Sequence, residues 1–148
     1  MTTLRTQELT ESREKYMQNL IIESIKECDE RIKNLQELIL PKNAWVYLSS
    51  SQEYTEFQID MSMQYLDNDI KLAKIEKLIY NAMNSSSKNK IAPMLLSKFD
   101  ELMSLTYDIS GNLVSTGCRK EGVHIEYCKD TLKRREYIKM LCDYMSVV

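Results

Sequence analysis

Glycine and proline are scarce in this sequence. Its 148 residues include three glycines and two prolines, where average usage gives roughly ten and seven. All three glycines lie between Gly111 and Gly122. The shortage excludes collagen-like and linker-like chains, and the glycine-rich loops that bind phosphates or dinucleotides are missing from the sequence. Long helical segments are the expected result.

Long apolar runs and a strong net charge are missing too. No run approaches the roughly eighteen residues of a membrane-spanning helix, and the first residues lack the apolar core of a signal peptide. The net charge of -2 gives no general attraction to nucleic acid or to membranes, while 43% hydrophobic residues indicate a globular chain. We therefore expect an intracellular protein, cytoplasmic or nuclear, with its four cysteines reduced.

The first forty residues are rich in helix formers. An apolar stripe runs along them at spacings of 4, 3, 4, 3 and 4, through Ile21, Ile25, Cys28, Ile32, Leu35 and Ile39. This is the heptad pattern of a coiled-coil seam, although an amphipathic helix packed on its own domain also produces it. Residues 1–40 are predicted to form a long N-terminal helix and a possible oligomerisation segment, on which a small domain of residues 41–148 packs.

The segment after Pro41 has two competing interpretations. Residues 44–48 are aromatic and β-branched, as in a short strand. From Phe57 to Tyr65, apolar and polar residues alternate like those of a half-buried strand, but many of the apolar residues also share one side of a helical wheel. Some apolar residues would lie on the opposite side of such a helix: Ile59, Met63, Leu66 and Ile70. We therefore predict a strand at 54–60 that pairs with 44–48, followed by a helix over 62–83.

The glycines cluster in the second half of the chain. After a polar loop at 84–90 and a helix over 94–107, they indicate a hairpin of strands 113–118 and 123–128. Asp130 is the expected N-cap of a last helix. The predicted fold is α+β and mainly α, with a long amphipathic N-terminal helix, two β-hairpins and three further helices.

The predicted second hairpin holds the only histidine, His124. With Cys118, Cys128 and Cys142 it provides four ligands of the types that bind tetrahedral zinc. The set lacks a C-x-x-C motif, and the strand register places Cys118 on the opposite face from His124 and Cys128. These four residues are weak metal candidates. A nucleophilic pair of His124 with Cys128 or Cys118 has no supporting signature, so we expect no catalytic residue and no cofactor.

Basic residues gather in the last third of the chain. Residues 111–148 carry seven basic and five acidic side chains, a local charge of +2. The basic residues are Arg119, Lys120, Lys129, Lys133, Arg134, Arg135 and Lys139. A solvated face, an acidic protein partner and nucleic acid are all compatible with this cluster.

The leading hypothesis is a non-enzymatic protein that binds other proteins, or itself, as an adaptor, regulator or chaperone-like assembly subunit. Its partner would contact the N-terminal stripe, including Ile21, Ile25, Ile32, Leu35 and Ile39. A second contact would involve Arg119, Lys120, Lys133, Arg134 and Arg135. The coarse layout of the first eighty-odd residues, helix, hairpin and helix, resembles a prefoldin-type chaperone subunit. The alternative is a nucleic-acid-associated regulator that uses the basic C-terminal hairpin and helix.

Overall fold

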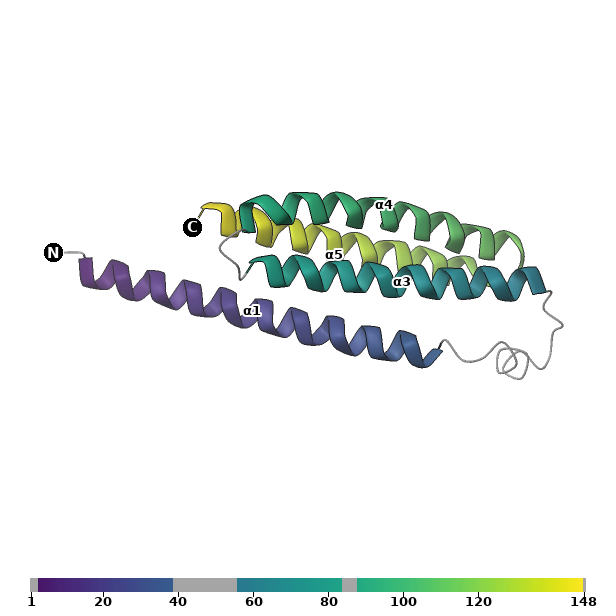
Figure 1. Cartoon of the computed structure of the whole chain (residues 1–148), viewed down its shortest axis with the longest axis horizontal. Helices are drawn as coiled ribbons and strands as arrows, with labels where there is room; N and C mark the ends of the chain where they lie inside the picture. The colour runs from purple at the N-terminus through teal and green to yellow at the C-terminus, as the bar shows by residue number, and fades with distance from the viewer. Residues whose placement is uncertain (1–2, 39–55, 84–87, 148) are drawn as a thin grey trace.

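The computed structural model describes residues 3–38, 56–83 and 88–147, and this part of the chain forms helices without any strand. The helices are α1 (Thr3–Leu38), α3 (Glu56–Met83), α4 (Lys88–Ser115) and α5 (Glu121–Val147). Each runs antiparallel to the one before it (Figure 1), which is the up-down order of a helical bundle. None of these helices is both long and apolar enough to span a membrane.

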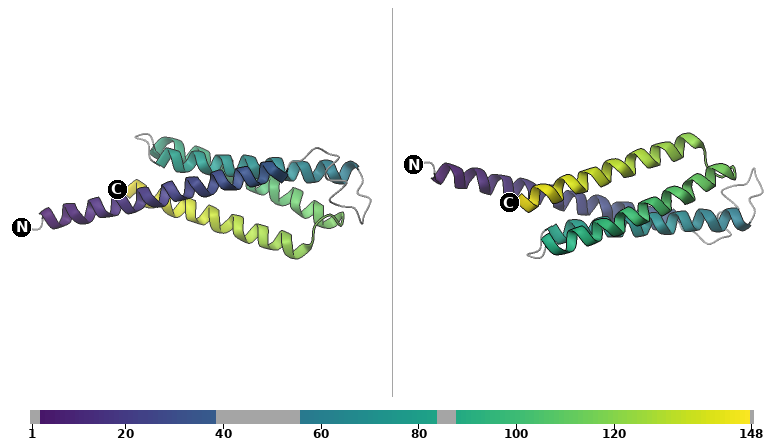
Figure 2. Two further views of the ribbon diagram at one scale, coloured as in Figure 1. Left: turned by 90° about the horizontal axis from the view of Figure 1, so that it is seen from below. Right: turned by 90° about the horizontal axis from the view of Figure 1, so that it is seen from above.

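Helix α3 is at the centre of the bundle. It packs closely on α1 and α4 and makes a smaller contact with α5. The main core combines side chains from all four helices: Met17, Ile21 and Cys28; Leu72, Ile79, Tyr80 and Met83; Phe99; and Ile138 and Leu141. A second core lies towards the turn between α4 and α5 and contains Tyr65, Leu66, Leu113 and Tyr127. The N-terminal turns of α1 extend past the ends of the other helices (Figures 1 and 2).

The prediction of a strand at 54–60 is wrong. Residues 56–60 belong to α3, which continues without a break to Met83 and so confirms the helix predicted over 62–83. Apolar residues occur on opposite sides of α3 because other helices cover it from more than one direction. Leu66 and Ile70, whose positions argued against one continuous helix, are both buried. The partner strand predicted at 44–48 lies outside the described residues.

The second hairpin prediction is also wrong, because α4 includes residues 113–115, the chain turns at 116–119, and α5 includes all of 123–128. Of the three glycines, Gly111 lies in α4, Gly117 in the turn between the two helices and Gly122 in α5. Gly117 has a φ of +79°, and two hydrogen bonds close the end of α4: Gly117 N–H to Val114 O at 3.1 Å and Cys118 N–H to Leu113 O at 2.9 Å. This is the Schellman arrangement, in which glycine accommodates the left-handed residue. The α+β prediction is therefore corrected to an all-helical fold for the described residues.

The buried line of α1 differs from the predicted stripe. It has the expected spacings of 4, 3, 4, 3 and 4, but it passes through the buried Met17, Ile21, Ser24 and Cys28 and then the half-buried Arg31 and Leu35. Ile25 and Ile32 are half-buried at its edge, and Ile39 lies outside the described residues. The heptad period is present, with two polar positions inside it.

Candidate functional site

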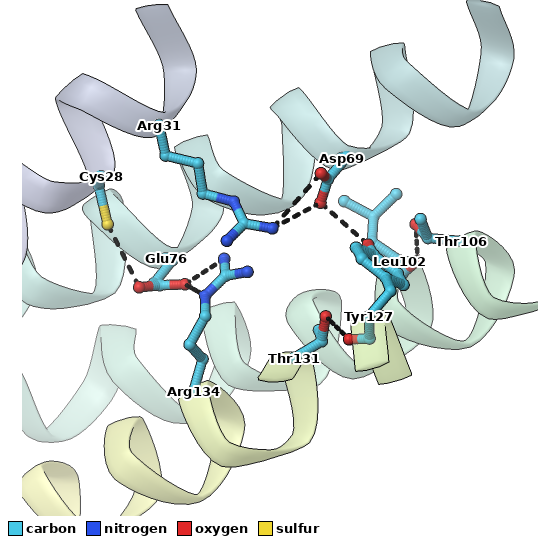
Figure 3. Close-up of polar contacts among 9 residues, drawn as sticks. All are labelled: Cys28, Arg31, Asp69, Glu76, Leu102, Thr106, Tyr127, Thr131 and Arg134. Atoms are coloured by element: carbon cyan, nitrogen blue, oxygen red, sulfur yellow. Dashed lines mark hydrogen bonds and ion pairs between the residues drawn. The ribbon is translucent and has the colours of Figure 1, made fainter. Parts of the chain in front are cut away.

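Two carboxylates are buried in the middle of α3. Asp69 and Glu76 are seven residues apart, which places them two turns apart on one face of the helix. Their side chains are 3% and 8% exposed. A buried charge is costly unless it is paired and hydrogen-bonded. Both carboxylates meet this condition through the ion-pair cluster, which we define as Cys28, Arg31, Asp69, Glu76, Tyr80, Tyr127 and Arg134; Figure 3 shows all of it except Tyr80.

Asp69 accepts hydrogen bonds from two other helices. Nη2 of Arg31, on α1, lies 3.3 and 3.4 Å from the two carboxylate oxygens. The hydroxyl of Tyr127, on α5, donates to Oδ1 at 2.9 Å. Burial, reinforced by the charge of Asp69, raises the pKa of Tyr127, so this phenol remains a donor at neutral pH. Asp69 thus joins α1 to α5 (Figure 3).

Glu76 contacts the same two helices, α1 and α5, two turns further along α3. Its Oε1 accepts from Nε of Arg134, on α5, at 2.8 Å. Its Oε2 accepts from Sγ of Cys28, on α1, at 3.3 Å and from the hydroxyl of Tyr80 at 3.2 Å. Burial and the nearby charge of Glu76 raise the pKa of the Cys28 thiol. Cys28 is therefore a protonated donor and not an activated nucleophile.

Arg119 adds a third cation beside this cluster. Its guanidinium carbon lies 4.4 Å from the ring centre of Tyr65 and 5.4 Å from that of Tyr127. The two rings meet edge to face, with centres 5.3 Å apart. Burial raises the pKa of Tyr65 to about 12. Arg119, in the turn after α4, thus makes cation–π contacts with a tyrosine of α3 and a tyrosine of α5.

His124 lies at a contact between α4 and α5. Its Nδ1 is 2.7 Å from Oγ of Ser110, a fully buried residue of α4. A Cβ on Gly111 would lie 3.9 Å from the imidazole ring. Cys128 follows one turn later, with Sγ 3.8 Å from the ring nitrogens. Burial raises the pKa of the Cys128 thiol, which is opposite to the shift that a nucleophilic cysteine needs.

The structure does not bring the four zinc candidates together. Cys118 lies in the turn after α4 and packs against the second core. Cys142 is fourteen residues beyond Cys128 on α5, a separation of about 21 Å at 1.5 Å per residue. Within the described residues, no group of three or more His, Cys, Asp or Glu side chains is placed to hold a metal ion.

The basic cluster is dispersed in the same way. Arg134 belongs to the ion-pair cluster and Arg119 covers tyrosine rings. Arg135 bonds to Asp100 on α4 at 2.9 and 3.0 Å. Lys120 and Lys133 are exposed. Three of the five basic residues predicted to bind a partner therefore make contacts within the chain.

The ion-pair cluster was not predicted from the sequence, although a signal for it exists. Arg31 gives no such signal, because the stripe read from the sequence passes through Ile32 between Cys28 and Leu35. Asp69 and Glu76 lie among the apolar residues that face the cores. Charged residues at helical positions that periodicity assigns to a core are the mark of a buried ion pair. Comparison with protein-family models, with curated proteins and with solved structures finds no match for the chain.

Proposed function

We propose that this protein acts by binding other proteins, as a non-enzymatic adaptor, regulator or assembly subunit, and that α1 provides the contact. One observation supports this proposal above others. Beside its buried line, α1 carries a second line at spacings of 3, 4 and 3, through Ile22, Ile25, Asp29 and Ile32. Ile22 is 46% exposed, and Ile25 and Ile32 are half-buried. A helix with apolar residues on two adjacent heptad lines can pack on two neighbours at once.

The projecting end of α1 supports the same proposal. Residues 11–16 are all exposed, and Tyr16 is 64% exposed. A helix without tertiary contacts is only marginally stable in water. A partner could stabilise these turns, but the residues that continue the second line into them are the polar Gln18, Lys15 and Glu11, and Tyr16 lies on another side of the helix. The apolar part of the proposed contact therefore extends from Ile22 to Ile32.

The nucleic-acid alternative has less support. Phosphate binding needs cations that face solvent, whereas Arg134, Arg135 and Arg119 are engaged within the chain. A chaperone-like role was suggested by a layout that included a hairpin, and the second strand of that hairpin is helical. The four free thiols are compatible with the expected intracellular location.

The test compares two exposed apolar residues. Ile22→Asp replaces the most exposed isoleucine of the second line, and Leu105→Asp replaces a residue of α4 that is 47% exposed. Light scattering after chromatography measures self-association, and pull-down from the source cell measures binding to other proteins. We expect Ile22→Asp to remove the association and Leu105→Asp to keep it, while both variants retain wild-type helix content. The proposal is wrong if the wild-type chain is a monomer and no captured protein depends on Ile22.

A further inference from the structure

Helices α1 and α5 share their polar partners although neither packs chiefly on the other. Helix α1 packs mainly on α3, and α5 packs on α4 and α3. Asp69 nevertheless accepts from Arg31 of α1 and Tyr127 of α5. Glu76 accepts from Cys28 of α1 and Arg134 of α5. The same two helices therefore meet at both carboxylates (Figure 3).

We propose that Asp69 and Glu76 couple the docking of α1 to the docking of α5, so that the two helices attach to α3 cooperatively and loosen together. This goes beyond the proposed binding function and does not depend on it. The coupling depends on the hydrogen bonds that α1 and α5 donate to these two carboxylates, and substitutions can remove the donors one at a time.

The sign of the coupling follows from the cost of burying a carboxylate. When α1 docks, it takes water away from Asp69 and Glu76, and its own donors replace only part of that hydration. The donors of α5 supply the rest. If α5 is displaced or lacks these donors, α1 must bury carboxylates that are only partly hydrogen-bonded, which is unfavourable. The same reasoning holds with the two helices exchanged, because thermodynamic coupling is reciprocal.

The coupling gives α1 an influence beyond its own interface. A partner that draws α1 away from α3 would expose both carboxylates to water. The remaining bonds from Tyr127 and Arg134 would then compete with water, so α5 would be held less firmly. Ile138 and Leu141 of α5 also share the main core with Met17 and Ile21 of α1. The test must therefore separate the carboxylate route from this apolar contact.

Cys28 is a built-in probe of α1 docking. It is 2% exposed in the bundle, and burial and Glu76 raise the pKa of its thiol, so it reacts with iodoacetamide only when α1 opens. Its alkylation rate in the full chain, followed by mass spectrometry of the Cys28 peptide, reports the population of the open form when closing is fast. Hydrogen exchange of the α4 amides around Phe99, which is fully buried, reports global unfolding in the same sample.

The first comparison removes a single hydroxyl. Tyr127→Phe deletes the α5 donor to Asp69, whereas Tyr107→Phe deletes a hydrogen bond from α4 to the backbone oxygen of Cys128. Both tyrosines belong to the same edge-to-face group, with ring centres 6.1 Å apart. We expect Tyr127→Phe to speed Cys28 alkylation by roughly tenfold, the effect of losing one hydrogen bond to a charged group. Tyr107→Phe should leave the rate within about twofold of wild type.

The second comparison works in the opposite direction and keeps α5 intact. Arg31→Met removes the α1 donor to Asp69, whereas Asp29→Asn weakens the exposed pair that joins α1 to Lys77. Arg31→Met should raise hydrogen exchange in α5 between Tyr127 and Arg134 by several-fold, and Asp29→Asn should not. If a variant unfolds too easily to be measured at 25 °C, the same comparison is made at lower temperature in a stabilising osmolyte.

The coupling is supported if Cys28 alkylation rises more in Tyr127→Phe than in Tyr107→Phe and also rises more than exchange around Phe99. It is overturned if the two tyrosine variants alkylate at the same rate. It is also overturned if the Cys28 rate only follows global unfolding, or if Arg31→Met loosens α1 and leaves exchange in α5 unchanged.

Discussion

Arg134 and Arg135 are neighbours on α5 but bond to different helices. Arg134 bonds to Glu76 on α3, and Arg135 bonds to Asp100 on α4. Their side chains are similarly covered, at 19% and 23% exposed, but Glu76 is 8% exposed and Asp100 is 40% exposed. Adjacent arginines on one helix thus pin α5 to two different neighbours, one through a buried pair and one through a pair near the surface.

These two arginines are expected to differ in their effect on stability. Arg134→Met leaves the buried Glu76 without its cation and should lower the free energy of unfolding by about 3–5 kcal/mol. Arg135→Met leaves a partly exposed aspartate and should cost about 1 kcal/mol or less. Urea unfolding followed by circular dichroism measures both values. Equal losses for the two variants would show that the Glu76 pair is not buried as described.

The double variant Arg134→Met with Glu76→Met measures the net contribution of the ion pair to stability. The single variant measures instead the cost of leaving one buried charge without its partner. Since both charges are removed together, no uncompensated charge remains, and apolar side chains of similar size fill the space. We expect the double variant to lie within about 2 kcal/mol of wild type and above Arg134→Met alone. A double variant less stable than the single one would mean that a methionine in place of Glu76 cannot compensate for the lost hydrogen bonds to Cys28 and Tyr80.

Periodicity predicted the helices well where one face of a helix is buried. The heptad spacing of α1 and the stripe that contains Ile138 and Leu141 both led to the right element type. It failed only for the start of α3, where residues 56–60 were predicted as part of a strand. Leu66 and Ile70 are buried on a different side from Leu72, which counted against one continuous helix. A helix covered from several directions has no single apolar face. Its sequence therefore lacks the one-sided apolar pattern by which a surface helix is recognised.

The glycine cluster misled the prediction for a different reason. Glycine ends helices as readily as it turns hairpins, and nothing local in the sequence separates the two uses around Gly117. The ion-pair cluster could not be predicted from local sequence patterns, because its ion pairs join residues far apart in the chain. Arg31 and Asp69 are 38 positions apart, and Glu76 and Arg134 are 58 positions apart. Helical spacing can mark Asp69 as inward-facing, but only packing decides which cation it meets.

The three glycines should respond differently to alanine. Gly117 has a φ of +79°, where a Cβ costs about 1–2 kcal/mol. Gly122 lies in the first turn of α5 with nothing within 4 Å of the added Cβ, so Gly122→Ala should stabilise the protein by about 0.4–1 kcal/mol. Gly111→Ala should also stabilise it slightly, since the new methyl would make an ordinary contact with His124. Thermal unfolding ranks the variants, and a stabilising Gly117→Ala would contradict the Schellman turn.

Zinc is expected to have no effect on stability. Cys128 and His124 share one turn of α5, but Cys142 is about 21 Å away along the helix, and two ligands do not make a structural zinc site. The melting temperature should be the same in zinc and in a chelator. A zinc-dependent rise that is lost in His124→Ala would show that the turn after α4 brings Cys118 to this pair.

Alkaline pH should unfold the protein steeply. The pKa of Cys28 is raised from 9.0 by burial and by Glu76, and the pKa of Tyr65 is raised from 10.0 to about 12 by burial. Burial, reinforced by a neighbouring carboxylate, raises the pKa of Tyr80 and Tyr127 as well. In each case the folded state holds a proton that the unfolded chain releases. The stabilisation is therefore complete below pH 9 and is lost as the pH rises through the folded-state pKa.

The magnitude of this loss can be tested with Cys28. Each such group lowers the free energy of unfolding by about 1.4 kcal/mol per pH unit above its unfolded pKa. Between pH 9 and 10 the thiols titrate before the phenols, so Cys28→Ala should reduce the slope of stability against pH by about that amount. Urea unfolding at pH 7, 9 and 10 measures the slope. Parallel profiles for wild type and Cys28→Ala would mean that the Cys28 thiol already ionises in the folded protein, and hence that Glu76 does not hold it as a donor.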